Sequence, residues 1–200
     1  MNTQIFNGEI FLITGIADAN SLAMYVAKEI IANGGKVICT GLGLSSFHKG
    51  LSEKAQVFLQ RSYSDFQLAV QQELGHTPTA ILDVSLDESM EAFALGLSEQ
   101  GIKLNGFLHA IAMDKTIRQK EVKPLLEVTK DEFADTMEIS AFSLVRLSHF
   151  LVKHNVLAEG ASICSISYIA AAKVTFHPYR NISIAKAALE RITVELADEL

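Results

Sequence analysis

Short apolar runs alternate along the chain with longer segments in which apolar residues recur every three to four positions. The runs are nearly continuous in apolar residues and end in glycine or polar residues, which is typical of strands buried on both faces of a parallel sheet. The longer segments have the spacing of helices with one buried face. The predicted strands are residues 10–14, 36–40, 79–84, 106–111 and 162–167, and the predicted helices are residues 22–31, 45–74, 87–97, 129–154 and 181–200, the second of them broken.

This alternation predicts an α/β fold, with a doubly wound parallel sheet covered by helices on both faces in three αβα layers (Rossmann-like). We expect at least five parallel strands in a single domain covering residues 1–200. The first two strands and the helix between them form a βαβ unit of about 30 residues, whose crossover should be right-handed. Sheets of this kind bind ligands beyond the carboxyl ends of their strands.

The turn after the first strand is a candidate phosphate site. It starts at Gly15 and leads into a helix whose N-terminus and backbone N–H groups could hold a pyrophosphate. Gly15 is the only glycine in this turn, and an ordinary turn with Ser21 as the helix N-cap fits equally well. The second strand ends at Thr40 without the acid that usually holds the adenine ribose of NAD, and His48 and Lys49 lie too far along to indicate a phosphate site for NADP. The choice between NADH and NADPH stays open.

Tyr179 and Lys186 are the first candidates for catalysis. Their spacing of seven residues is two helical turns, so both polar groups project toward one site if Pro178 opens the helix. A phenol beside an ammonium is a proton donor with a lowered pKa, which the reduction of a carbonyl or an enone by hydride transfer requires. Such a pair often arises by chance, so its meaning depends on the rest of the chain.

The composition excludes several functional classes. The chain has 200 residues, 49% of them hydrophobic, and a net charge of -6. No segment supplies the basic patch that a nucleic acid or an anionic membrane requires. No apolar run reaches the roughly 20 residues of a transmembrane helix, and residues 1–8 do not resemble a signal peptide, so we expect a cytoplasmic protein. Cys39 and Cys164 lie in runs that we expect to be buried strands, and they indicate neither a disulfide nor a metal site.

Other polar residues have structural interpretations. His109 lies inside an apolar strand, where a packed, hydrogen-bonded histidine is more common than an acid or a base. His177 lies near Tyr179, but we do not expect it to be catalytic. Thr129 and Glu132 have the spacing of a capping box and mark the start of a helix.

Several motifs lie at the predicted strand ends and in the last two helices. They are Gly15-Ile16-Ala17 and Ser21-Leu22-Ala23 after the first strand, Asp83-Val84 after the third, residues 109–112 after the fourth, residues 139–143 in the long helix, and then Ser167-Tyr168-Ile169, Tyr179 and Lys186-Ala187. Together these motifs resemble those of the enoyl-acyl-carrier-protein reductases, a divergent branch of the short-chain dehydrogenase/reductases. The resemblance covers essentially the whole chain, and a serine in the first turn combined with a tyrosine and a lysine separated by six residues distinguishes this branch.

The resemblance implies reduction of a trans-2-enoyl thioester on acyl carrier protein by NADH or NADPH, a step of fatty acid biosynthesis. Hydride would go from the nicotinamide to the β-carbon, and Tyr179 would hydrogen-bond the thioester oxygen as enolate charge develops there. Lys186 would hold the hydroxyls of the nicotinamide ribose. Tyr168 would be a second tyrosine lining the substrate, although a core tyrosine with a satisfied hydroxyl fits nearly as well.

The resemblance also implies a set of cofactor contacts along the strand ends. Gly15, Ala17, Ser21 and Leu22 would line the pyrophosphate, Asp83 and Val84 the adenine, and Ala112 and Ile139 the neighbouring ribose and adenine walls. From their position at the ends of their strands, we also expect Thr40 and Ala110 to contact the cofactor.

Three features depart from the family pattern. Tyr168 and Tyr179 lie eleven residues apart, whereas the family has ten. Ala112 replaces a glycine where the backbone normally approaches the cofactor closely. The family also has a sixth strand, a nicotinamide-contacting loop, a substrate-covering helix pair and a seventh strand beyond the position of Leu200. We expect a site without them to clamp the nicotinamide and exclude water less well.

Two other functions stay open. A 3-oxoacyl or ketone reductase of the short-chain dehydrogenase type needs a serine hydroxyl near the tyrosine, at about the place of Ser165 or Ser167. A non-catalytic relative could keep dinucleotide binding and act as a subunit or regulator. We also expect a homodimer or homotetramer formed through helices 129–154 and 181–200, because they carry more apolar residues than one sheet face should cover.

Overall fold

The centre of the fold is a five-stranded sheet. The computed structural model describes residues 4–118, 121–176 and 179–200. The strands lie in the order β3-β2-β1-β4-β7 and every neighbouring pair is parallel, which confirms the predicted doubly wound α/β sheet. The strands are β1 (Ile10–Ile13), β2 (Lys36–Gly41), β3 (Thr79–Ile81), β4 (Leu104–His109) and β7 (Leu157–Ser165).

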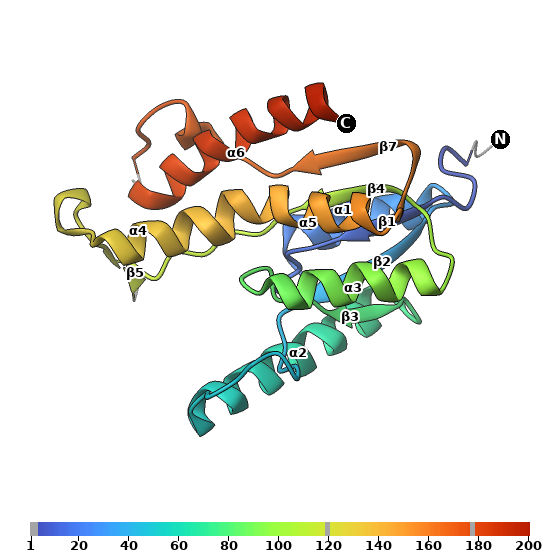
Figure 1. The fold of residues 1–200 in the computed structure, drawn as a ribbon, viewed down its shortest axis with the longest axis horizontal. Coiled ribbons are helices and arrows are strands. Elements are labelled where there is room, and N and C mark those ends of the chain that lie inside the picture. Colours follow the sequence, from blue (N-terminus) through green and yellow to red (C-terminus); the bar gives the residue numbers. More distant parts are fainter. Residues whose placement is uncertain (1–3, 119–120, 177–178) are drawn as a thin grey trace.

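Helices cover both faces of this sheet and give the three predicted layers. On one face α1 packs beside α2, and on the other α3 packs beside α5, which also contacts α6. Figure 1 shows α3 and α5 side by side along the sheet, and α6 beside β7. The helices are α1 (Leu22–Ala32), α2 (Glu53–Leu74), α3 (Asp87–Glu99), α4 (Lys130–Met137), α5 (Ser143–Lys153) and α6 (Arg180–Glu199).

Successive side chains of the central strands enter two separate cores, one on each face of the sheet. Leu12 belongs to the core under α3, α5 and α6, whereas Ile13 belongs to the core under α1 and α2. Phe107 and Leu108 divide between the two cores in the same way. Because neighbouring residues along a strand are both buried, β1 is apolar at all of its positions, and β2 and β4 each contain consecutive apolar residues.

The second helix differs from its prediction. α2 begins at Glu53 rather than at residue 45, and it is one continuous helix rather than a broken one. Its buried residues are Leu59, Phe66 and Val70. Phe58, which the pattern placed inward, is 63% exposed. The prediction for Phe58 was wrong because only one stripe of this helix meets the sheet, and Leu59 occupies that stripe.

Two strand boundaries also differ, whereas the others agree to within two residues. β3 ends at Ile81 rather than at residue 84, because the N–H of Asp83 donates to the Ser89 hydroxyl instead of to a strand. β7 begins at Leu157 rather than at residue 162. It is an edge strand in which exposed and half-buried residues alternate, so its first half is not an apolar run. For the same reason Cys164, predicted to be buried, is exposed, whereas Cys39 is buried as predicted.

The predicted helix 129–154 is divided by a π-helical turn. Thr129 caps α4 in a capping box with Glu132, as the spacing indicated. Glu138–Phe142 then form the π-helical turn, and α5 continues from Ser143 along nearly the same line (Figure 1). Such turns insert an extra residue into a helix and often occur at functional sites. Here the turn carries Ser140, whose hydroxyl reaches the loop after β4.

The remaining elements are short. β5 (Ile117–Arg118) pairs antiparallel with β6 (Glu121–Val122), and 3-10 turns occur at Leu125–Glu127 and Ile169–Ala171. Within the three described ranges, no helix combines the length and the apolar character that a membrane crossing requires.

Candidate functional site

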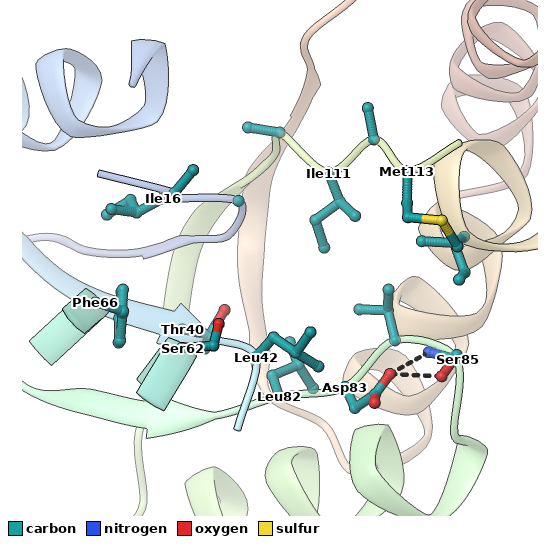
Figure 2. A pocket seen from close by; sticks show the side chains of 17 residues that line it. Ile16, Thr40, Leu42, Ser62, Phe66, Leu82, Asp83, Ser85, Ile111 and Met113 are labelled. Carbon is teal, nitrogen blue, oxygen red and sulfur yellow. Dashed lines mark hydrogen bonds between the residues drawn. The ribbon is translucent and has the colours of Figure 1, made fainter. Parts of the chain in front are cut away.

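A cavity of about 410 Å³ lies at the carboxyl ends of the central strands, where the doubly wound sheet predicts a ligand. Its volume is within the range of small-molecule sites. Figure 2 shows Ile111 and Met113 on one side of the cavity, and Leu82 and Asp83 on the opposite side. Most of the predicted cofactor contacts line it, namely Gly15, Ala17, Thr40, Asp83, Val84, Ala110, Ala112 and Ile139.

The first turn is held tightly against the loop that follows β4. The Thr14 hydroxyl donates to the Leu108 carbonyl at 2.8 Å and accepts from the N–H of Ala110 at 3.3 Å. Gly15 has a φ of +76°, and a Cβ at this residue would lie 2.1 Å from the carbonyl oxygen of Ala110. Glycine is therefore required here by the backbone conformation and by the close approach of the two segments.

Ser21 and Leu22 do not line the cavity. Ser21 is the N-cap of α1, where its hydroxyl accepts from the N–H of Met24 and donates to the carbonyl of Asp18. The capped turn is thus confirmed. Leu22 is 66% exposed. A pyrophosphate contact by these two residues stays a prediction, for which the N-terminus of α1 is the structural basis.

The carboxylate of Asp83 is held on both oxygens at the end of β3. Oδ1 accepts the N–H of Ser85 at 2.9 Å and its hydroxyl at 2.6 Å (Figure 2). Oδ2 lies 3.0 Å from Nε2 of His48, in the loop after β2. The sequence indicated no role for His48, because it lies too far along the chain for a phosphate site for NADP. No local pattern indicated the pair, since 35 residues separate its members and only the parallel sheet brings the two loops together.

Ser140 binds the loop after β4, on the side of the cavity opposite Asp83. Its hydroxyl accepts from the N–H of Met113 at 2.9 Å and donates to the carbonyl of Met113 at 3.0 Å. The side chain is completely buried. One hydroxyl thus satisfies both backbone groups of a loop residue, which a strand neighbour would otherwise do. The neighbouring Ile139 and Met113 both line the cavity, so the π-helical turn and the loop form one wall.

Lys186 links helix α6 to the same wall. Its ammonium donates to the carbonyl of Ile166 at 2.8 Å and to the carbonyl of Ile111, which lines the cavity, at 3.1 Å. The side chain is buried, with 5% of the residue exposed. Burial lowers the pKa of Lys186 to about 8, because the charged form loses its water.

The two predicted tyrosines lie together at the start of α6. The ring centroids of Tyr168 and Tyr179 are 6.2 Å apart, and the hydroxyl of Tyr168 is 2.9 Å from that of Ser183. Tyr179 is the residue before α6 and is 41% exposed. α6 begins close to the predicted residue, while His177 and Pro178 lie outside the described residues. Tyr168, Tyr179 and Lys186 do not line the cavity themselves, and the bond to Ile111 connects Lys186 to it.

Four consecutive residues at the end of β7 each bond to α6. Ser165 bonds the hydroxyl of Thr193, Ile166 accepts from Lys186, Ser167 donates to the carboxylate of Glu190, and Tyr168 bonds Ser183. These four hydrogen bonds fix Tyr168 and Lys186 relative to one another. They also direct the hydroxyls of Ser165 and Ser167 onto α6.

His109 is a packed residue, as its position in a strand indicated. It is fully buried, and its Nε2 lies 2.8 Å from the hydroxyl of Ser143, which itself donates to the carbonyl of Ile139. Burial, together with the nearby charge of Lys186, lowers the pKa of His109 to about 3. The imidazole is therefore neutral at physiological pH and is unsuited to proton transfer there.

Known proteins are similar to this chain in sequence and in fold. A family model described as enoyl-(acyl carrier protein) reductase matches residues 15–200. An enoyl-acyl-carrier-protein reductase (NADH) of Rhizobium meliloti is 28% identical over 196 residues, which are 98% of this chain and 64% of that protein. The corresponding protein of Aquifex aeolicus is 30% identical over 199 residues, 98% of this chain and 65% of that protein. The chain thus spans slightly less than two thirds of the length of these relatives.

A solved structure has the same fold. The reductase of Anaplasma phagocytophilum, solved in complex with NAD, superimposes with a TM-score of 0.76 at 28% sequence identity. The similarity covers 98% of this chain and 66% of that one.

Proposed function

Because this chain belongs to the enoyl-(acyl carrier protein) reductase family, we propose that it binds a nicotinamide dinucleotide in the cavity and reduces an enoyl thioester carried by acyl carrier protein. The observation that carries this proposal is the position of Lys186. Its ammonium donates to Ile111, a cavity residue, and to Ile166, which precedes the segment bearing Tyr168. One cation thereby joins the cavity to the segment that leads into Tyr168.

We infer how a dinucleotide lies in the cavity from the residues that line it. Gly15 presents bare backbone at the first turn, where a side chain would collide with Ala110, and the N-terminus of α1 follows it. We infer that the pyrophosphate lies at this turn, because backbone N–H groups and a helix N-terminus favour anions. The adenosine then lies toward Thr40, Asp83 and Val84, at the ends of the next two strands.

We propose NADH rather than NADPH as the cofactor. Among the described residues that line the cavity, none is Lys, Arg or His, and Asp83 is the only charged one. A 2′-phosphate on the adenosine ribose needs a nearby cation, usually an arginine. The relatives from Rhizobium meliloti and Aquifex aeolicus are also named for NADH.

Lys186 and Tyr179 have different roles in the proposed reaction. The bound nicotinamide would supply the hydride. Two of the three N–H donors of Lys186 bind the carbonyls of Ile111 and Ile166, which leaves one donor for a cofactor ribose hydroxyl. Tyr179 presents a partly exposed phenol beside Tyr168. We infer that this phenol donates a hydrogen bond to the thioester oxygen as negative charge develops there.

The hydrogen bonds at the end of β7 favour enoyl reduction over ketone reduction. A ketone reductase would need the hydroxyl of Ser165 or Ser167 free to face the substrate beside the tyrosine. Both hydroxyls instead bond side chains of α6, Thr193 for Ser165 and Glu190 for Ser167. We therefore keep the enoyl thioester as the proposed substrate.

We propose a homodimer or homotetramer through α5 and α6. Val152, Val194 and Leu200 are large apolar residues that are 46%, 56% and 61% exposed on these helices or at their ends. A hollow of about 290 Å³ lies between the end of α6 and α5. Light scattering at micromolar concentration should give at least the mass of a dimer, and a monomer would contradict this proposal. The cytoplasmic location stays a prediction.

Two measurements test the proposed function. NADH should raise the melting temperature of the purified chain, because a ligand that binds only the folded state stabilises it. Crotonyl-acyl carrier protein should then be reduced at the expense of NADH absorbance, and Tyr179→Phe should abolish this turnover without abolishing NADH binding. If neither NADH nor NADPH changes the melting temperature at millimolar concentration, the proposal fails. Binding without turnover would support the alternative of a non-catalytic subunit or regulator.

A further inference from the structure

His48 and Asp83 form an almost fully buried pair at the end of the cavity. Nε2 of His48 lies 3.0 Å from Oδ2 of Asp83, and their side chains are 8% and 13% exposed. Nδ1 of His48 accepts the backbone N–H of Ser45 at 3.1 Å. A backbone N–H can only donate, so the ring proton is on Nε2 and the histidine donates to the carboxylate.

The remaining bonds of Asp83 leave one acceptor position. Oδ1 accepts both the N–H and the hydroxyl of Ser85, which occupy its two lone pairs (Figure 2). Oδ2 accepts from His48 and keeps one lone pair. Because Asp83 lines the cavity, a ligand meets a carboxylate that is restrained on both oxygens and that can accept one more hydrogen bond.

We propose that His48 is a positioning residue that orients Asp83 so that its last acceptor selects a purine with a 6-amino group over one with a 6-oxo group. This inference rests on the proposed function, since it requires that a dinucleotide binds in the cavity. A 6-amino group donates to the carboxylate, whereas a 6-oxo group places oxygen against oxygen. A buried acceptor that is left unpaired discriminates strongly between such analogues.

Without His48, the carboxylate of Asp83 would keep only its bonds to Ser85, and Oδ2 would lose its restraint. The loop after β2 would lose its link to the end of β3 as well, because Ser45 bonds the same ring. A purely structural role of His48 would weaken every dinucleotide by the same factor. A positioning role would weaken the adenine dinucleotide more than the hypoxanthine dinucleotide.

The experiment compares NADH with reduced nicotinamide hypoxanthine dinucleotide, using the fluorescence of the shared nicotinamide to measure both dissociation constants. We expect the wild-type chain to prefer NADH by at least about tenfold, and His48→Ala to reduce the preference to about twofold. His48→Gln should restore most of it, because its amide N–H can reach the position of Nε2. The matched control is His76→Ala, since His76 is exposed beyond the end of α2 and should leave both constants unchanged.

Each outcome decides between the hypotheses. Equal affinity of the wild-type chain for the two dinucleotides overturns the proposal without any variant, even if His48→Ala does not fold. An unchanged preference in His48→Ala, or an equal loss for both dinucleotides, also overturns it while the proposed function stands. If the wild-type chain binds neither NADH nor NADPH, the proposed function itself fails.

Discussion

The ammonium of Lys186 lies 3.1 Å from the carbonyl oxygen of Ile111 and so joins helix α6 to the wall of the cavity. The same ammonium lies 2.8 Å from the carbonyl of Ile166. The segments after β4 and β7 therefore share one buried cation. This one side chain therefore links a residue that lines the cavity to the segment that leads into Tyr168.

Replacing Lys186 with methionine should weaken NADH binding by at least about tenfold, because both carbonyls lose their donor and the cofactor loses a charged one. Fluorescence titration measures this loss. Lys36→Met, at an exposed position of β2, is the control and should bind NADH as the wild-type chain does. Unchanged affinity in Lys186→Met would separate this lysine from the cofactor.

The pH dependence of binding and that of stability should have opposite signs. The pKa of Lys186 is about 8 in the folded state, whereas 10.5 is the ordinary value that a lysine regains when the chain unfolds. NADH affinity should fall as the pH rises through 8, because the ammonium loses a proton that it would donate. Between pH 8 and 10.5 the unfolded chain binds more protons, so the free energy of unfolding should rise, by on the order of 3 kcal/mol for this group. Urea unfolding at several pH values, with Lys186→Met as reference, isolates this contribution, which would be absent if both proteins gave the same profile.

Gly15→Ala should abolish NADH binding and lower the free energy of unfolding by ~2–4 kcal/mol, because the new Cβ meets the carbonyl of Ala110 at a positive φ. Gly96→Ala is the matched control. Gly96 lies inside α3 and has open space around its Cβ position, so alanine should raise the free energy of unfolding by ~0.5–1 kcal/mol. Urea unfolding and fluorescence titration check both variants, and a fully stable Gly15→Ala would show that the two segments can separate.

Ser140→Ala should lower the free energy of unfolding by ~1–3 kcal/mol and weaken NADH binding, because both backbone groups of Met113 lose their partner beside the cavity. Ser148→Ala removes a similarly buried hydroxyl farther along the same helical segment, whose bond within the described part of the chain is to the carbonyl of Leu144. This control should cost less than ~1 kcal/mol and leave NADH binding intact. Equal effects of the two variants on binding would argue against a role of the π-helical turn in shaping the cavity.

Ser167→Ala should keep enoyl turnover within about twofold of the wild type, whereas Tyr179→Phe should lose more than about 100-fold. The serine hydroxyl is bonded to Glu190, and we therefore expect it to make no contact with the substrate. Initial rates with crotonyl-acyl carrier protein measure both variants. If both variants lost turnover to a comparable extent, this result would support the ketone reductase mechanism instead.

Much of the sheet could be predicted from the sequence because the central strands are buried on both faces. Leu12 and Ile13 enter different cores, and so a continuous apolar run marks their strand. The edge strand β7 has no such constraint, and its first five residues lie outside the predicted strand. The inward placement of Phe58 failed for a similar reason, since an apolar residue in a surface helix can point to solvent.

Part of the candidate site could also be predicted from the sequence, and part could not. Motifs at the strand ends placed Gly15, Asp83 and Ala110 at the cavity, since parallel strands bring their carboxyl ends to one edge. The pairs His48–Asp83 and Ser140–Met113 could not be predicted, because each joins loops or helices whose approach depends on the packing of the whole fold. The direction of Ser167 toward Glu190 was equally inaccessible.

The sequence by itself determined the order in which the main strands and helices follow one another along the chain, the parallel sheet, and the edge of the sheet at which a ligand would bind. These features follow from burial periodicity and from the geometry of βαβ units. Only the tertiary structure decided which polar groups meet there. It placed the Lys186 ammonium on the carbonyls of Ile111 and Ile166, and it paired His48 with Asp83. Hydrogen bonds of this kind depend on distances of about 3 Å between residues far apart in the chain, which no local pattern specifies.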